Sequence, residues 1–364
     1  MKISAVEAIP LSIPFSHGGR PQGWGGRPWE RLDIVVVKVE TDAGITGYGE
    51  AFSYNCRRAV GAAVDDMVAP LAVGREADDI AALMREIQLE LHLFGRYGIT
   101  MFAISGLDIA LWDIAGKAAG LPLRRLLGGA AKASVPCYAS LFKYLDAELV
   151  AARTRQALEE GYRYIKLHER ALPEVRAARE AAGAGVPLML DVNCAWSAEE
   201  ARTIVPELIE LELHWLEEPI WPPENFAGLA DLQDSFGIAI AAGENACTAW
   251  QFAALIEAGA VSYAQPSVTK VGGVSEMQKV AALAEVAGLA LAPHAPYFGP
   301  GFLATLQFTA ALPGEVLCER LHVELEASLS GAAIDPVDGA LAVPDGPGLG
   351  LEPDADVIKD YRVD

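Results

Sequence analysis

Residues 161–219 read GYRYIKLHERALPEVRAAREAAGAGVPLMLDVNCAWSAEEARTIVPELIELELHWLEEP and alternate between two kinds of pattern. Short apolar runs occur at 164–167, 188–191 and 215–217. Between them lie longer stretches with helical periodicity, and Ser197 with Glu200 gives one of these stretches a capping box at its start. Strands that are separated by helices run parallel, because the helix forms the long crossover connection that parallel pairing requires. The segment therefore predicts consecutive βα units.

The same alternation continues on both sides of this segment. Further short apolar runs occur at 135–138, 238–240, 261–264, 289–292 and 316–319. Eight units of about 25 residues each predict a closed (β/α)8 barrel, a modified TIM barrel of the α/β class. A doubly wound open sheet is the structural alternative.

The residues before the barrel have a different pattern. Runs at 6–9 and 32–40 predict strands, and a turn joins the second to 45–50 in an antiparallel hairpin. Residues 16–28 are rich in glycine and proline and predict an irregular loop, whereas 57–117 has helical periodicity. These features together predict a small α+β domain.

The chain therefore divides into three parts. We expect the α+β domain over residues 1–128, the barrel over 129–329, and a Gly- and Pro-rich tail over 330–364. The tail contains no ninth βα unit, and we expect it to pack back on the first domain and complete it.

Composition limits the possible partners and location of the protein. The 364 residues include 52% hydrophobic side chains, and 28 Lys and Arg against 49 Asp and Glu give a net charge of −21. Such a charge repels phosphate backbones and anionic lipid, so we expect neither nucleic-acid nor membrane binding. The first residues lack the uninterrupted apolar core of a signal peptide, and we expect a cytoplasmic protein. The five cysteines include no C-x-x-C pair and are interpreted as buried thiols.

Polar side chains recur about every 25 residues, where the predicted barrel strands end. They are Lys166, His168, Asp191, Glu217, Glu244, Ser267, Lys270, His294 and Glu319. Each charge alone is as readily explained by a solvated loop, but the set would meet at the C-terminal face of the barrel, where barrel enzymes keep their active sites.

Asp191, Glu217 and Glu244 come from consecutive predicted strands. Three converging carboxylates repel one another unless a cation binds, and an all-oxygen ligand set favours Mg²⁺. We expect one ion per subunit, with Mn²⁺ as a possible substitute. Lys166 and His168 would lie on one side of the ion, and His294, from the seventh strand, on the opposite side. Taken alone, Lys166 is also explained as a strand-end lysine packed along its stem, and either histidine as a hydrogen-bonded residue of the core.

These residues resemble those of a known family. The pieces Lys166-x-His168, Asp191-x-Asn193, Glu217-Glu218-Pro219, Gly243-Glu244-Asn245, Lys270-Val271-Gly272-Gly273, His294 and Glu319 are similar to motifs of the enolase superfamily. The resemblance is to the mandelate racemase/muconate lactonizing enzyme family, in particular its mandelate racemase subgroup. It covers nearly the whole chain, including ISGLDIALWD at 104–113 and Gly128-Gly129 at the entry into the barrel.

The resemblance implies a capping domain on a barrel and a Mg²⁺-assisted removal of the proton α to a carboxylate, through an enediolate. It implies that Asp191, Glu217 and Glu244 bind the metal. Lys166 would contact the substrate carboxylate or tune the base. Glu319, in its protonated form, would donate a hydrogen bond to a carboxylate oxygen.

The chain departs from the family pattern at two positions. His168 stands where a second lysine is common, and an imidazole near its usual pKa would serve as a base without a large shift. Ser267 stands where the subgroup has an aspartate paired with the seventh-strand histidine, so it would orient His294 without adding charge. Lys270 is interpreted as structural, with electrostatic compensation for the missing charge as the alternative.

A base and an acid on opposite faces permit several outcomes. We expect dehydration of a sugar acid to a 2-keto-3-deoxy acid, and the alternative is a racemase, epimerase or lactone cycloisomerase. A metal-dependent metabolite-binding protein without turnover is the alternative outside enzymes. The predicted substrate contacts, in the capping-domain loops and at the barrel mouth, are His17, Arg20, Trp24, Tyr54, Asn193 and Tyr297. A homo-oligomer with an even number of subunits is expected by resemblance.

Overall fold

The computed structural model describes residues 1–24, 27–129 and 132–364. The first part of the chain builds an antiparallel sheet in the order β14-β1-β4-β5. These strands are β1 (Ile3–Ser16), β4 (Arg31–Thr41), β5 (Thr46–Ala51) and β14 (Glu324–Leu325). The hairpin of β4 and β5 confirms the predicted turn, with Val35 opposite Ala51 and Glu40 opposite Thr46.

The segment between β1 and β4 is more regular than predicted. A short ribbon pairs β2 (Gly23–Trp24) with β3 (Arg27–Pro28) in antiparallel register. The prediction of a wholly irregular 16–28 was wrong at these residues, because an edge ribbon accepts a proline that has no N–H to donate.

Helices cover one face of the antiparallel sheet. They are α1 (Arg57–Ala62), the π-helical turn η1 (Ala63–Val68), α2 (Ala69–Ala72), α3 (Ile80–Glu90), the 3-10 turn η2 (His92–Phe94) and α4 (Ile99–Ala119). α4 packs directly on β5, where a Cβ on Gly49 would lie 1.9 Å from the carbonyl oxygen of Gly106. By length and composition α4 would be able to cross a membrane, but 78% of its most apolar window is buried within the fold. We therefore interpret it as a core helix.

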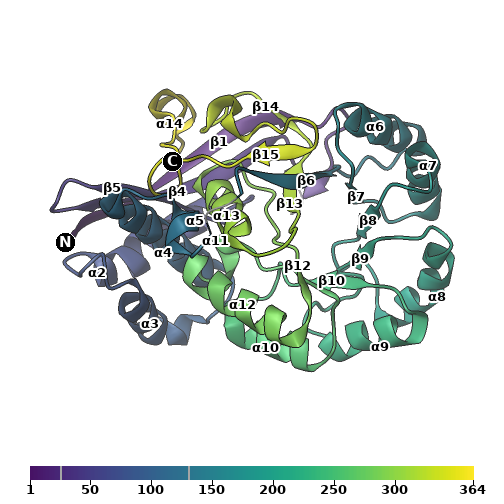
Figure 1. The fold of residues 1–364 in the computed structure, drawn as a ribbon, viewed down its shortest axis with the longest axis horizontal. Helices are drawn as coiled ribbons and strands as arrows, with labels where there is room; N and C mark the ends of the chain where they lie inside the picture. The colour runs from purple at the N-terminus through teal and green to yellow at the C-terminus, as the bar shows by residue number, and fades with distance from the viewer. Residues whose placement is uncertain (25–26, 130–131) are drawn as a thin grey trace.

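The second part of the chain is a curled parallel sheet ringed by helices (Figure 1). Among the described residues, its parallel strands number eight, in the order β12-β11-β10-β9-β8-β7-β6-β13. The strands are β6 (Ser134–Ser140), β7 (Ile165–Leu167), β8 (Leu188–Asp191), β9 (Trp215–Glu217), β10 (Ile240–Ala242), β11 (Tyr263–Ala264), β12 (Ala290–Leu291) and β13 (Cys318–Leu321). The predicted barrel fold is confirmed.

Helices lie on the outside of this sheet, one before β6 and the others in the connections between strands. They are α5 (Leu123–Leu126), α6 (Ala147–Glu159), α7 (Leu172–Ala182), α8 (Ala198–Ile209), α9 (Phe226–Phe236), α10 (Thr248–Glu257), α11 (Val268–Val271), α12 (Gly273–Ala287) and α13 (Pro300–Ala311). The predicted capping box at the start of α8 is present, with Ser197 and Glu200 bonded reciprocally. Along the chain β13 is followed by β14 and not by a helix, so the eighth βα unit lacks its helix.

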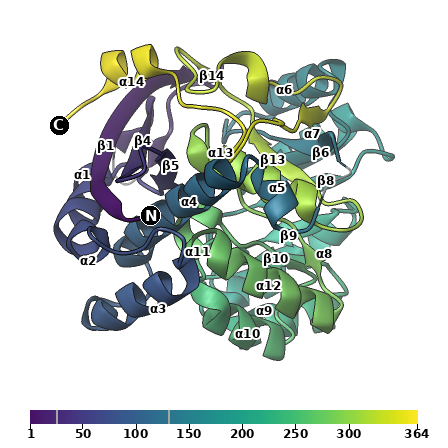
Figure 2. The same ribbon diagram turned by 60° about the vertical axis from the view of Figure 1, so that its left-hand side comes forward.

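The tail contacts both parts of the molecule. It contains the 3-10 turn η3 (Gly331–Ile334), β15 (Ala340–Ala342) and α14 (Ala355–Tyr361). α14 lies beside β1 (Figure 2), and β15 pairs antiparallel with β6 of the barrel. The pairing with β6 was not anticipated. The domain boundaries after residues 128 and 329 stay predictions.

Two buried carboxylates join the capping domain to the barrel. Glu50, on β5, accepts a hydrogen bond from the backbone N–H of Gly301 at 2.8 Å, in the first turn of α13. Asp108, on α4, accepts one from the N–H of Ser275 at 3.0 Å, in the first turn of α12. Burial raises the pKa of each carboxyl to about 7, although the helix N–H groups oppose the shift.

We expect the Glu50→Gln variant to be more stable than wild type at pH 8 by about 1–3 kcal/mol. The folded-state pKa of Glu50 is raised from 4.5 to about 7, so its contribution to stability is complete below pH 4.5 and is lost as the pH rises through 7. Glutamine keeps the acceptor oxygen without the charge. Denaturant unfolding at pH 5 and pH 8 tests this.

The advantage of Glu50→Gln should shrink toward pH 5. Glu86→Gln is the control, because Glu86 is exposed and its ion pair with Arg75 lowers the pKa of the carboxyl. An equal gain for Glu50→Gln at both pH values would contradict the assignment of the effect to a buried charge.

Candidate active site

The residues predicted at the strand ends meet at one end of the barrel. Lys166, Asp191, Glu217 and Glu319 belong to barrel strands β7, β8, β9 and β13, and their side chains are fully or almost fully buried. The others lie within three residues after a strand: His168 after β7, Glu244 after β10, Ser267 after β11 and His294 after β12. Parallel strands carry their carboxyl ends to the same edge of the sheet, which explains why residues so far apart in sequence come together.

Asp191, Glu217 and Glu244 form a compact acidic cluster. One carboxylate oxygen of each lies within 4.8 Å of the others. Burial, together with the charges of Asp191 and Glu319, raises the pKa of Glu217 to about 8 even though Lys166 opposes the shift. Lys166 therefore does not balance all of the negative charge of the cluster. This set of oxygen donors, with Asp191 and Glu217 buried and Glu244 half-buried, fits a divalent cation of the Mg²⁺ kind.

Lys166 lies at the centre of the carboxylates. Its Nζ is 2.9 Å from Glu217 Oε1, 2.8 Å from Glu319 Oε1 and 3.8 Å from Asp191 Oδ2. Burial alone would lower the pKa of Lys166, but Glu217 and Glu319 raise it well above its ordinary value. Lys166 is therefore an ammonium ion.

The neighbours of Glu319 favour its ionised form in the metal-free protein, whereas the resemblance implies a protonated form with substrate bound. Burial would raise the pKa of Glu319, but Lys166 and His294 outweigh burial and hold it at about 2. Glu319 also accepts hydrogen bonds from Ser140 Oγ at 2.8 Å and from the Ala295 N–H at 2.9 Å. The expectation of a protonated Glu319 took account of the neighbouring anions but not of the contact with Lys166.

His168 has a hydrogen-bond partner at each ring nitrogen. Nε2 is 3.3 Å from Asp191 Oδ2, and Nδ1 is 2.6 Å from the carbonyl oxygen of Leu141. Burial lowers the pKa of His168, but Asp191 reverses this and the net shift is upward. The sequence-based expectation of an ordinary imidazole pKa therefore differs from the structure, because it did not include the contact with Asp191.

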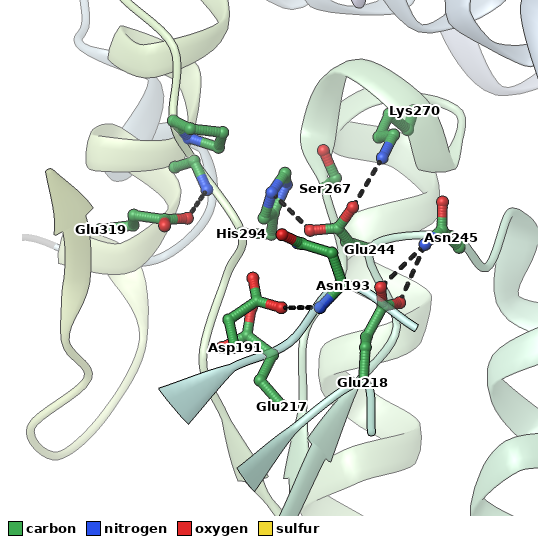
Figure 3. A network of polar contacts seen from close by, with 12 residues as sticks. Asp191, Asn193, Glu217, Glu218, Glu244, Asn245, Ser267, Lys270, His294 and Glu319 are labelled. Carbon is green, nitrogen blue, oxygen red and sulfur yellow. Dashed lines mark hydrogen bonds and ion pairs between the residues drawn. The ribbon is translucent and has the colours of Figure 1, made fainter. Parts of the chain in front are cut away.

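His294 and Lys270 reach Glu244 from two sides (Figure 3). His294 Nε2 is 2.8 Å from Glu244 Oε2, and Lys270 Nζ is 3.4 Å from Oε1. Burial would raise the pKa of Glu244, but these two groups lower it well below its ordinary value. Lys270 thus acts on the charge of the cluster, which favours the electrostatic alternative over the purely structural interpretation.

Ser267 does not orient His294 in the direct way that was predicted. Its Oγ contacts the hydroxyl of Tyr297, and that hydroxyl lies 3.3 Å from His294 Nδ1. Serine is shorter than aspartate, and the phenol of Tyr297 occupies the space between it and the imidazole. Tyr297 is 1% exposed and does not line the cleft, so it lies behind His294 and not where a substrate contact was predicted.

A cleft opens above the cluster. Asn193 and Tyr54 line it as predicted, although the Tyr54 hydroxyl donates to the carbonyl oxygen of Pro296. Two other predicted contacts lie elsewhere: His17 is buried with its ring stacked on Phe142, and Arg20 is exposed. The side chain of Trp24 lies outside the described part of the chain.

The distal wall of the cleft consists mainly of residues outside the set of predicted substrate contacts. They are Gln22, Trp29, Phe52, Phe142, Lys143, Pro296 and Leu321. Trp29 packs on Phe142 with ring centroids 5.2 Å apart, and on Tyr54 at 5.1 Å. Because these side chains come from both parts of the molecule, they share no spacing.

Supporting residues behind the acids were also missed. Trp215 Nε1 donates to Glu217 Oε2 at 2.8 Å, and Asn245 Nδ2 holds both oxygens of Glu218. Burial and the charge of Glu244 raise the pKa of Glu218 well above its ordinary value. The pair Glu217-Glu218 stood out in the sequence, but nothing in it showed that the second carboxyl turns toward Asn245.

Comparison with known domain families identifies the family of this chain. A family described as Enolase C-terminal domain-like matches residues 149–357, and the Mandelate racemase / muconate lactonizing enzyme, N-terminal domain matches residues 28–128. The chain belongs to the mandelate racemase/muconate lactonizing enzyme family of the enolase superfamily. The family resemblance predicted from the sequence is confirmed.

Individual members of the family are similar over the full length. Arabinonate dehydratase of Saccharolobus solfataricus is 32% identical over 342 residues, which cover 91% of each chain. D-galactarolactone cycloisomerase of Agrobacterium fabrum is 31% identical over 100% of this chain and 99% of its own. A racemase from Streptomyces coelicolor, solved with bound magnesium, is 31% identical with a TM-score of 0.86 and covers 99% of this chain and 100% of its own.

These relatives settle the class of the protein. This member of the enolase superfamily is an enzyme, a lyase or isomerase that uses Mg²⁺ and acts on a small molecule, as was predicted.

Proposed function

We propose that the enzyme removes the proton α to the carboxylate of a sugar acid and eliminates the β-hydroxyl as water, giving a 2-keto-3-deoxy acid. The observation that carries this proposal is the placement of titratable groups on both flanks of one acidic cluster. His168 contacts Asp191, and His294 contacts Glu244. The similarity to arabinonate dehydratase supports dehydration as the outcome.

In the proposal, Asp191, Glu217 and Glu244 hold the Mg²⁺ ion, which supplies positive charge for the developing enediolate. Lys166 and Glu319 lie beside this cluster, 2.8 Å from each other, and bind the substrate carboxylate. Because Glu319 is ionised, it needs to take up a proton with the substrate before it donates a hydrogen bond.

The imidazoles move the protons. The base takes the α-proton, the electron pair of that C–H bond forms the enediolate, and the C–O bond at the β-carbon then breaks. His294 donates the proton that converts the departing hydroxyl to water, and the resulting enol becomes the 2-keto acid. His168, on the opposite flank and 3.3 Å from Asp191, serves as the base.

Cycloisomerisation is the second candidate, because the distal wall is largely aromatic. Trp29, Phe52 and Phe142 present flat apolar faces to the cleft. The C–H face of a closed sugar ring packs on such surfaces, whereas an extended polyol would leave hydroxyls without partners. The similarity to D-galactarolactone cycloisomerase supports this candidate.

A substrate screen in deuterated water distinguishes the candidates. Aldonates, aldarates, their lactones and smaller 2-hydroxy acids are incubated with enzyme and Mg²⁺, and NMR follows α-deuteration and 2-keto acid formation. A 2-keto product formed from an open-chain acid with loss of water establishes dehydration, and conversion of a lactone to an isomer without gain or loss of water establishes cycloisomerisation. Binding without any α-proton exchange would contradict both and favour the metabolite-binding alternative.

The two histidines are expected to act on different faces of the substrate. With a sugar acid from that screen, His168→Ala should lose α-proton exchange and turnover together, by about 100-fold or more. His294→Asn should keep α-proton exchange while product formation falls by a similar factor. Exchange and turnover are measured in parallel by NMR, and identical losses of both in the two variants would contradict the division of roles.

We further propose a cytoplasmic homo-oligomer with an even number of subunits. The similarity to sugar-acid dehydratases supports the location, and the family resemblance supports the assembly. Sedimentation of the purified protein tests the latter.

A further inference from the structure

The distal wall of the cleft carries one strong positive charge. Among the described residues that line the cleft, Lys143 is the one lysine or arginine. It follows β6 along the chain, directly after Phe142 of the same wall, and its side chain is half-buried. The carboxylates along the cleft lie elsewhere, in the acidic cluster and beside Lys166. The two ends of the cleft therefore differ in their charge.

Lys143 has no anionic partner within 4 Å in the described part of the chain. Glu169, the carboxylate that follows the strand next to β6, accepts hydrogen bonds from the backbone N–H of Tyr144 at 2.5 Å and of Leu145 at 3.2 Å instead. Burial and the guanidinium of Arg170 lower the pKa of Lys143, and Glu169 opposes this shift only in part. The positive charge of Lys143 is therefore available to a ligand in the cleft.

The neighbouring backbone fixes the position of Lys143. Two residues before it, the carbonyl oxygen of Leu141 lies 2.6 Å from His168 Nδ1. Phe142 stacks on His17 with ring centroids 4.3 Å apart, and the hydrogen bonds to the Glu169 carboxylate hold the two residues after Lys143. Lys143 is thus held on the flank of the proposed base, on the distal side of the acidic cluster.

We propose that Lys143 binds a carboxylate at the far end of the substrate, so that the enzyme prefers dicarboxylic sugar acids (aldarates) to monocarboxylic ones (aldonates). This inference rests on the proposed function, which places the reacting carboxylate beside Lys166. A bound sugar acid covers the ammonium group of Lys143 and removes water from it. A terminal hydroxyl does not neutralise the charge, whereas a terminal carboxylate forms a charge-assisted hydrogen bond with it.

The rest of the distal wall strengthens this preference. Trp29, Phe52 and Phe142 line it with aromatic rings, which solvate an ammonium group poorly compared with water. Gln22 is the other polar side chain of the wall, and its Nε2 donates to the carbonyl oxygen of Arg20 at 3.1 Å. A ligand that displaces water from this wall therefore has to supply the anion itself.

The test uses pairs of acids that differ only at the far end, an aldarate and the aldonate of the same configuration, for several configurations. With Mg²⁺ present, we expect wild type to have a kcat/KM at least about 10-fold higher for the aldarate of its preferred pair. Lys143→Met should lower this aldarate-to-aldonate ratio by about 10–100-fold. Lys143→Arg keeps the charge and should keep the ratio within about threefold of wild type.

Lys279→Met is the matched control. Lys279 is 59% exposed and pairs with Glu276 on the outside of the barrel, so its removal should leave the ratio unchanged. A wild-type enzyme that prefers the aldonate, or an unchanged ratio in Lys143→Met, would overturn the role of Lys143 while the proposed dehydration stands.

Binding separates this inference from the proposed function. If wild type turns over neither acid of any pair, the proposed function fails, and calorimetry of the same pairs with Mg²⁺ still tests Lys143. Tighter binding of the aldarate, lost in Lys143→Met and kept in Lys143→Arg, would support the inference. Equal binding of the two acids, or binding of neither, would overturn it.

Discussion

Replacing Glu217 with glutamine is expected to abolish Mg²⁺-dependent turnover, with a loss of about 10³-fold or more. Glu217 is fully buried and shares the cluster with Asp191 and Glu244. The amide keeps the shape of the side chain but removes one of the negative charges that the cation needs. Turnover measured across a Mg²⁺ titration should show both a weaker dependence on the ion and a lower plateau.

The same variant should not lose stability without metal. Burial raises the pKa of Glu217 to about 8, so its ionised form is unfavourable in the metal-free protein at neutral pH. In EDTA, the Tm of Glu217→Gln should therefore equal or exceed that of wild type, while the increase in Tm that Mg²⁺ gives the wild type should be lost. The exposed Glu207→Gln serves as the control, and wild-type activity in Glu217→Gln would contradict the metal assignment.

The barrel was predictable because its elements repeat locally. Each strand is a short apolar run and each helix has its own periodicity, so the number and order of strands needed no long-range information. Boundaries were less exact: the run at 238–240 was predicted as a strand, but β10 spans Ile240–Ala242. The pairing of β15 with β6 was not predicted, because contacts between distant segments leave no periodic pattern.

The acidic cluster was predictable for the same reason. Asp191, Glu217 and Glu244 end successive strands, so regular spacing translates directly into proximity. The distal wall of the cleft has no such regularity. Phe142 and Trp29 come from different parts of the molecule, and only the packing of the capping domain on the barrel brings them together. Tyr297 was predicted to bind substrate because its position near the barrel mouth does not reveal which way the ring points.

Lys166→Met is expected to lower both activity and stability. Lys166 is fully buried between Glu217 and Glu319, and methionine replaces the ammonium with an apolar group of similar length. Removing one partner of a buried ion pair costs about 3–5 kcal/mol, because the remaining carboxylates keep their desolvation penalty.

The stabilisation by Lys166 depends on pH. Lys166 lowers the pKa of Glu319 to about 2, so this stabilisation is present above the ordinary pKa of 4.5 and is lost as the pH falls toward 2. The loss in Lys166→Met should thus be larger at pH 7 than at pH 4 in denaturant unfolding. Lys279→Met removes a lysine that is 59% exposed and 2.6 Å from Glu276, and it should change little. Equal unfolding free energies for the two variants would show that Lys166 does not neutralise the cluster.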